Sequence, residues 1–164
     1  GSSASLLALL QAAALRCHFT LLVAEGRADG LGHATAAALE LSVPVRIIEP
    51  TAMARCMSRV RLVLCAAHTV LHDGGIVGEL GTLTAAIVAR AHRKPLCVTA
   101  PHYCFDRDER SHLDAAASLA ALGGRLDATP PHLVTWFFTD FGVLTPAAVA
   151  DWQLGVSERG FGHS

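Results

Sequence analysis

The stretch LVLCAAHTVLHDGGIVGELGTLTAAIVARA, residues 62–91, decides the fold that this sequence predicts. It opens with an apolar run, Leu62–Ala67, of the kind that forms a buried strand. A turn sequence, His72-Asp73-Gly74-Gly75, comes next, and a segment with helical apolar periodicity covers Leu80–Ala91. A strand, a glycine-rich loop and a helix in this order are typical of parallel α/β folds.

Strands and helices alternate on the two sides of this stretch. Apolar runs at Phe19–Ala24, Val45–Ile48 and Leu96–Thr99 predict three more strands. Because these runs are apolar along their length, we expect helices on both faces of a mainly parallel, doubly wound, Rossmann-like sheet of the α/β class. The other helices expected before residue 62 span the segment up to Arg16, Gly32–Leu41 and Pro50–Met57.

The C-terminal third is predicted to be mainly helical. Residues 111–122 are expected to form a short helix. Thr129-Pro130-Pro131 has the residues that open a helix, so we expect one that ends at Gly142. Thr145-Pro146 is expected to open another, which reaches Trp152.

Length and composition indicate one folded domain. The chain has 164 residues, of which 52% are hydrophobic and 16% charged, enough apolar side chain for a full core. We expect a single domain over residues 1–154 and a flexible tail over residues 155–164. A formal net charge of −1 gives no bulk attraction to nucleic acid. The low surface charge indicates that another chain covers part of the surface.

The cysteine count and the hydropathy indicate in which cellular compartment the protein is expected. There are five cysteines, an odd number, so reduced thiols in an intracellular, cytoplasmic protein are expected rather than a disulfide framework. Neither a signal peptide nor a transmembrane run is visible in the sequence, so no membrane partner is expected.

A ligand is expected at the carboxyl ends of the strands. Backbone amides at Gly78–Thr82 would lie at a helix N-terminus, where a phosphate could bind, although the glycines could equally serve only the turn. The spacing fits neither a dinucleotide fingerprint nor a P-loop. Looser alternatives are a zinc site among Cys65, His68 and nearby residues, and a nucleophilic Cys104. The absence of any Cys-x-x-Cys pair argues against a metal, and none is expected.

An aromatic group marks the C-terminal part. Five of the chain's nine aromatic residues lie between Trp136 and Trp152. One face of a helix cannot bury them all, so we expect some to face a partner at a subunit interface; core packing alone is the alternative. The residues expected at the interface are Trp136, Phe137, Phe141, Leu144 and Trp152.

Four segments carry a family resemblance: DGGIVGELGT at 73–82, KPLCV at 94–98, TPPHLV at 129–134 and TDFGVLTPAAV at 139–149. With them the chain resembles the regulatory subunits of eukaryotic translation initiation factor 2B, the alpha subunit most, with beta and delta open. It is also similar to the related methylthioribose-1-phosphate and ribose-1,5-bisphosphate isomerases.

The resemblance implies the Rossmann-like C-terminal domain of such a subunit, without its N-terminal helical domain. It implies a non-catalytic part of the guanine-nucleotide exchange factor for initiation factor 2, which assembles with other subunits and senses the phosphorylated alpha subunit of that factor. A homodimer or hetero-oligomer is expected. The alternative is a sugar-phosphate isomerase-like enzyme or a sugar-phosphate binding module.

The resemblance also shows where isomerase chemistry is changed. His68 stands where the isomerases have an aspartate, Gly78-Glu79 where they have an asparagine–lysine pair, and Cys104 where they have a lysine. Their cysteine before the first helix has no counterpart beside Ser2 and Ser3. We therefore expect no catalytic residues and no cofactor, but a vestigial pocket for a sugar phosphate or nucleoside monophosphate. Its expected residues are Ser2, Ser3, Glu25, Arg27, His68, Gly74, Gly75, Gly78, Glu79, Gly81, Thr82 and Cys104.

Overall fold

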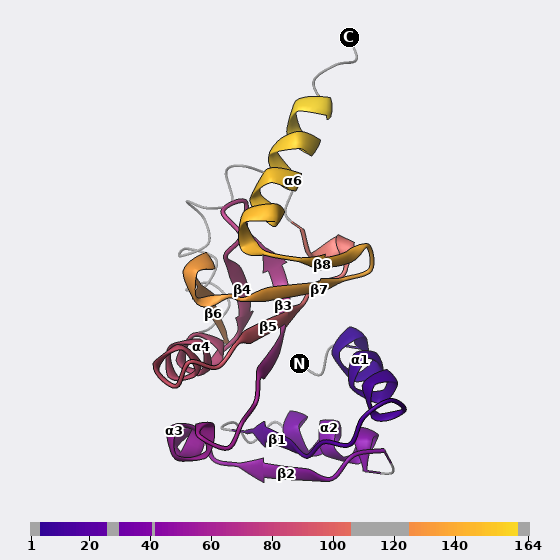
Figure 1. The fold of residues 1–164 in the computed structure, drawn as a ribbon, viewed down its shortest axis with the longest axis vertical. Helices are drawn as coiled ribbons and strands as arrows, with labels where there is room; N and C mark the ends of the chain where they lie inside the picture. Colours follow the sequence, from indigo (N-terminus) through magenta and orange to yellow (C-terminus); the bar gives the residue numbers. More distant parts are fainter. Residues whose placement is uncertain (1–3, 26–29, 41, 106–124, 161–164) are drawn as a thin grey trace. The chain divides into compact units, whose positions relative to one another are not determined.

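The chain forms two compact units, Gly1–Arg59 and Val60–Ser164, and each is described by itself (Figure 1). The structure is a computed structural model that describes residues 4–25, 30–40, 42–105 and 125–160. None of the helices in these ranges is long and apolar enough to cross a membrane. The short helix expected over residues 111–122 lies outside the described residues.

The first unit is a strand–helix–strand crossover. One helix precedes the crossover in the sequence and another follows it. Strand β1 (Leu21–Ala24) runs parallel to β2 (Val45–Ile48), with Leu21 opposite Val45. The buried apolar side chains of this unit are Leu10, Leu39, Val43 and Met57. The predicted elements here are confirmed. The helices are α1 (Ala4–Ala14), α2 (Leu31–Leu39), the 3-10 turn η1 (Pro50–Ala52) and α3 (Met53–Met57).

The second unit is built on a six-stranded sheet with strand order β6-β4-β3-β5-β7-β8. Its strands are β3 (Val63–Val70), β4 (Ile76–Glu79), β5 (Leu96–Thr99), β6 (Leu126–Thr129), β7 (Trp136–Thr139) and β8 (Gly142–Leu144). Strand β5 is parallel to both β3 and β7, whereas β4, β6 and β8 pair antiparallel with their neighbours. The predicted α/β class is confirmed, and the antiparallel strands are those that the sequence analysis did not predict.

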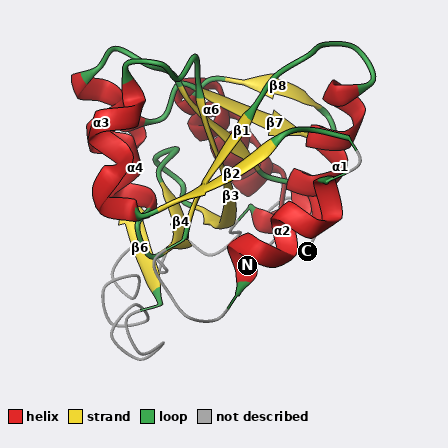
Figure 2. Cartoon of the chain, turned by 90° about the horizontal axis from the view of Figure 1, so that it is seen from below, coloured by secondary structure: helices red, strands yellow, loops and turns green. Residues whose placement is uncertain are grey.

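Two helices and two 3-10 turns complete this unit. They are α4 (Thr82–Ala91), η2 (His102–Cys104), η3 (Pro131–Leu133) and α6 (Pro146–Gly160). Helix α4 packs against β6, β3 and β5. Helix α6 lies apart from it, next to β8, in both views of the ribbon (Figures 1 and 2).

The core of this unit gathers around Phe137, the largest fully buried side chain among the described residues. Val98 on β5 and Val70 on β3 belong to the same cluster, as do Ala86 of α4 and Val149 of α6. Burying a side chain of this size stabilises a fold by about 1.5–3 kcal/mol. The Gln153 Nε2 atom adds a hydrogen bond from α6 to the Val70 carbonyl, at 3.4 Å.

Two parts of the prediction for this unit were wrong. The loop expected after Ala67 is instead a β3–β4 hairpin, and the helix expected from Thr129 to Gly142 is instead η3 followed by the β7–β8 hairpin. The aromatic residues of β7 suit a strand, and the Leu96 carbonyl accepts a hydrogen bond from the Thr135 amide, at 2.8 Å, so the segment continues the sheet.

Helix α6 begins at Pro146, next to the predicted start, but ends at Gly160 rather than at Trp152. Residues 155–160 of the expected flexible tail are therefore helical.

Gly74 closes the β3–β4 turn against the start of α6, and this contact yields a prediction. Its φ is +81°, and a Cβ there would lie 2.6 Å from the Pro146 carbonyl oxygen. Gly81 has a φ of +101° with no atom within 4 Å of such a Cβ. Gly81→Ala should therefore cost at least about 1 kcal/mol of unfolding free energy from the backbone alone. Gly74→Ala should cost about 1–3 kcal/mol more through the clash.

Urea unfolding followed by tryptophan fluorescence measures this difference, because both tryptophans, Trp136 and Trp152, lie in the second unit. Equal losses in the two variants would show that the Gly74–Pro146 contact does not matter.

Candidate functional site

The carboxyl ends of β3, β5 and β7 meet at one edge of the second unit's sheet, where an α/β fold places its ligands. His68 lies near the end of β3, and η2 follows β5. The Cys104 Sγ atom donates to the Ala67 carbonyl, at 3.5 Å, and so joins η2 to β3. The structure therefore brings His68 and Cys104 to the same edge.

His68 and Glu79 pair with each other across the β3–β4 hairpin. The His68 Nε2 atom lies 3.1 Å from the Glu79 Oε1 atom. The two side chains are 50% and 44% exposed, so the pair is open to solvent. A register shift between Ala67 and Thr69 marks a bulge in β3 at His68, a feature that re-aims a side chain. The edge thus carries a carboxylate matched to an imidazole, which gives a phosphate little attraction.

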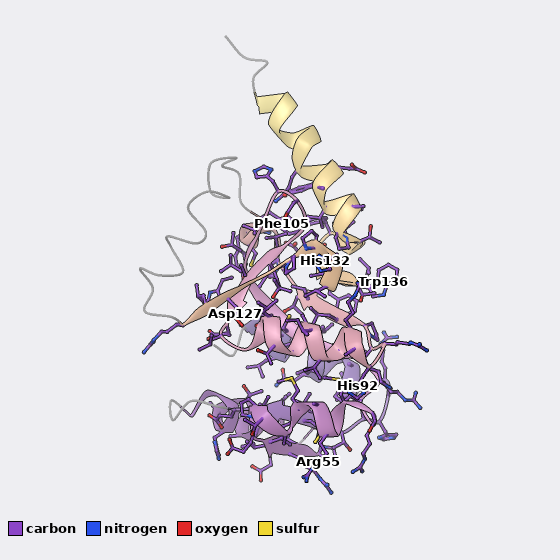
Figure 3. The ribbon with its side chains drawn as sticks, turned by 90° about the vertical axis from the view of Figure 1, so that its left-hand side faces the viewer. Arg55, His92, Phe105, Asp127, His132 and Trp136 are labelled. Atoms are coloured by element: carbon purple, nitrogen blue, oxygen red, sulfur yellow. The ribbon has the colours of Figure 1, made fainter. Side chains whose placement is uncertain are left out.

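The N-terminus of α4 already holds a carboxylate from within the chain. The Asp127 Oδ2 atom accepts hydrogen bonds from the Gly81 amide, at 2.6 Å, and from the Leu83 amide, at 3.1 Å. Asp127 stands opposite Gly78 in the β4–β6 pairing, and Figure 3 shows it beside one end of α4. Amides at a helix N-terminus bind anions, and here the anion is a side chain. The sequence analysis missed Asp127.

The glycines of the predicted loop serve turns and close packing. A Cβ at Gly78 would lie 3.1 Å from the Thr82 Oγ1 atom, whose hydroxyl donates to the Glu79 carbonyl at 2.6 Å. The Gly75 amide donates to the Asp73 Oδ1 atom, at 2.8 Å, within the β3–β4 turn. Of the two alternatives that the sequence left open, this geometry favours glycines that serve the backbone.

Cys104 lacks the features of a nucleophile. Its thiol is buried, and burial raises its pKa, with a further increase from the nearby Asp140 carboxylate. The His102 side chain pairs with Asp140 instead: its Nδ1 atom lies 2.5 Å from the Asp140 Oδ2 atom, and its amide donates to Oδ1, at 2.9 Å. Hydrogen bonds from His102 lower the pKa of the Asp140 carboxyl.

The remaining candidate residues of the pocket are Glu25, Ser2, Ser3 and Arg27. Glu25 is engaged inside the first unit, where its Oε1 atom accepts a hydrogen bond from the Gly32 amide, at 3.0 Å, and its Oε2 atom contacts His33. Ser2, Ser3 and Arg27 lie outside the described residues. Burial raises the pKa of Cys65 to about 12, and no group of three metal-ligating side chains occurs among the described residues.

Aromatic rings cluster where η2, the β7–β8 turn and α6 meet. The rings of Phe141 and Trp152 are stacked with centroids 5.2 Å apart, and the buried Phe105 ring lies 5.5 and 5.2 Å from them. Phe141 and Trp152, called the aromatic surface below, are 43% and 38% exposed.

The other residues expected at the interface lie elsewhere. Phe137 is fully buried, so its placement in an interface was wrong. Leu144 packs against the core, and Trp136 lies at the opposite end of β7 from the β7–β8 turn (Figure 3).

Residues 1–117 match the model of the initiation factor 2 subunit family. Translation initiation factor eIF2B subunit alpha of Dictyostelium discoideum is 33% identical over 87% of this chain and 52% of its own length. Methylthioribose-1-phosphate isomerase of Synechococcus sp. (strain CC9605) is 35% identical over 65% of this chain and 38% of its own length. The chain thus spans about half, or less, of these relatives.

A solved structure shares the fold. The tetrameric eIF2B-beta2-delta2 complex from C. thermophilum contains a chain that aligns with a TM-score of 0.78 at 23% identity, over 97% of this chain and 52% of that one.

The Asp127 carboxylate should stabilise α4 measurably. Asp127→Ala removes both hydrogen bonds to the helix N-terminus and should cost about 1–2 kcal/mol of unfolding free energy. Asp127→Asn keeps an oxygen acceptor and should cost only a few tenths of that value, because asparagine caps helices about as well as aspartate. Tryptophan-detected urea unfolding of both variants is the measurement. If the two variants lost the same amount, the contacts at Gly81 and Leu83 would not be what holds the helix.

Proposed function

Because the chain belongs to the initiation factor 2 subunit family, we propose that it is part of a non-catalytic regulatory subunit of the guanine-nucleotide exchange factor for translation initiation factor 2. The observation that carries this proposal is the occupied ligand edge. Glu79 pairs with His68, and the Asp127 carboxylate takes the amides at the N-terminus of α4. Both interactions place carboxylates where a sugar phosphate would need hydrogen-bond donors or positive charge.

The proposed subunit is alpha, supported by the 33% identity to the Dictyostelium alpha subunit, with beta and delta as the alternatives. Within that subunit, the chain belongs to the Rossmann-like C-terminal domain. The subunit works in the cytoplasm, restrains nucleotide exchange and senses the phosphorylated alpha subunit of initiation factor 2.

Assembly with other subunits is the physical basis of this role. The aromatic surface supports it, because Trp and Phe are enriched in the cores of interfaces and a stacked pair loses little conformational freedom on binding. Relatives of this fold assemble, as in the eIF2B-beta2-delta2 tetramer. The aromatic surface therefore pairs either with a second copy of the chain or with another regulatory subunit.

Recovery of partners tests the role directly. An affinity-tagged protein containing this chain, purified from its own cells and analysed by mass spectrometry, should recover other subunits of the exchange factor and of initiation factor 2. Recovery of neither set would reject the proposal.

Charge placed on the aromatic surface should weaken assembly. Phe141→Asp and Trp152→Asp should each raise the dissociation constant for self-association about tenfold or more, as expected when an interface anchor is lost. Leu62→Asp is the matched control, since Leu62 is 47% exposed and lies before β3, away from the aromatic surface. Sedimentation velocity over a concentration series measures the constants. An unchanged monomer–dimer equilibrium in both aromatic variants would exclude the aromatic surface from a self-association interface and leave only pairing with another regulatory subunit.

The second candidate function is that of a sugar-phosphate isomerase, favoured by the 35% identity to the Synechococcus enzyme. The occupied edge predicts no activity. The full-length protein should give no product from methylthioribose 1-phosphate or ribose 1,5-bisphosphate in a coupled chromatographic assay. Turnover of either compound would overturn the non-catalytic assignment.

A further inference from the structure

A second surface, at the opposite edge of the sheet, has a different chemistry. The C-terminal end of α4 and the 3-10 turn η3 border a shallow cleft of about 320 Å³. Arg90, Arg93, Lys94 and His132 line it, over Pro95 and Leu133, and these residues define the basic cleft. Figure 3 labels His92 at this end of α4 and His132 on η3. No carboxylate of the described residues is among the side chains that line the cleft.

Basic residues are concentrated at the C-terminal end of α4. Three of the chain's 13 lysine and arginine residues fall within residues 90–94, including the chain's one lysine. The chain as a whole carries a net charge of −1. No carboxylate of the described residues forms an ion pair with Arg90 or Arg93, because the ion pairs among those residues involve His33, His68 and His102.

Basic side chains often serve only to cap the C-terminus of a helix, but here the backbone already does so. The Lys94 amide donates to the Ala89 carbonyl, at 2.8 Å, and the Arg93 amide donates to the Arg90 carbonyl, at 3.0 Å. The His92 amide donates to the Val88 carbonyl, at 3.1 Å. The amides of residues 92–94 therefore satisfy the carbonyls of Val88, Ala89 and Arg90, and these bonds need neither the Arg90 nor the Arg93 side chain.

The backbone at Arg93 adds an independent observation. Its φ is 55°, and it is the one non-glycine residue with positive φ among the described residues. Glycine is the usual residue at such a position after a helix, because a side chain there strains the backbone by about 1–2 kcal/mol. Strain of this kind, kept at one exposed arginine, indicates that the side chain has a use.

Arg90 is positioned across the cleft. Its Nη1 atom donates to the His132 carbonyl, at 2.6 Å, and this bond ties the end of α4 to η3. A guanidinium has five N–H donors, so donors remain for an anion held in the cleft. Arginine binds carboxylates through two parallel hydrogen bonds, a geometry that a preoriented guanidinium favours.

We infer that the basic cleft docks an acidic peptide segment of a partner protein. Its open shape admits an extended chain, its arginines match carboxylates, and Pro95 and Leu133 offer apolar contact between the charges. Nucleic acid fits less well, because proteins that bind it carry a basic face on a basic domain, whereas this chain has a pI of about 6.8. The basic cleft is independent of the aromatic surface and of the proposed regulatory role.

The probe is a fluorescein-labelled octaglutamate peptide, titrated with the purified chain and read by fluorescence anisotropy at low salt. Arg90→Glu combined with Arg93→Glu should raise the dissociation constant about tenfold or more, since two charge pairs become repulsive. Arg61 is an exposed arginine before β3 and does not line the cleft. Arg61→Glu makes the same kind of charge change there and should change the dissociation constant less than twofold.

Arg93→Gly separates binding from folding. Glycine accepts the positive φ, so this variant should unfold at the same or a higher urea concentration than the parent chain and yet bind the peptide about threefold or more weakly. A variant that binds as tightly as the parent would overturn the role of Arg93.

Three results would overturn the docking of a peptide. The first is an equal loss of affinity in Arg61→Glu, which would show bulk electrostatics. The second is tighter binding of a labelled oligothymidylate than of octaglutamate, which would indicate nucleic acid. The third is full competition by millimolar inorganic phosphate, which would indicate a small anion site.

Discussion

The structure of the second unit depends on strand β5 being paired on both edges. Leu96–Thr99 are all buried and run parallel to β3 on one side and to β7 on the other. This pairing places Val98 opposite Cys65 and Phe137, so one row of side chains crosses the sheet beneath α4. Because the side-chain period of a strand is two residues, a slip of one residue would turn Phe137 out of the core. The register of β5 therefore fixes both the core and the edge at which the strands end.

At that edge several polar side chains pair with groups of the same chain. His68 meets Glu79, and His102 meets Asp140, while the Asp127 carboxylate occupies the first turn of α4. A site for an anionic ligand requires unused donors or positive charge, and this arrangement supplies its own anions instead. The fold is thus shared with isomerases, while the edge at which ligands bind in such folds carries carboxylates of the chain itself.

The second unit has an apolar surface and a positively charged surface, at opposite ends of its parallel strands. Beyond the carboxyl ends of the strands, Phe141 and Trp152 expose a stacked apolar pair, and before the amino end of β5, Arg90 and Arg93 expose positive charge. Apolar area contributes affinity through burial, whereas charge mainly sets the partner and the rate of association. A protein that assembles with related subunits and also recognises an acidic segment would use the two surfaces for these separate tasks.

The sequence by itself determined the α/β class and most elements whose partners are close in the chain. The bounds predicted for Val45–Ile48 and Leu96–Thr99 are those of β2 and β5, because continuous apolar runs between turn residues allow few other structures. The helix predicted around Trp136 was wrong, because the same aromatic spacing suits a helix or a strand until a neighbouring strand supplies hydrogen bonds.

Only the tertiary structure decided the site. Asp127 lies 46 residues from Gly81, and nothing local marks it as the group that caps α4. Its role arises only when β6 pairs with β4. Contacts of this separation depend on the packed sheet, and so the chemistry of the edge could not be read from residue spacing.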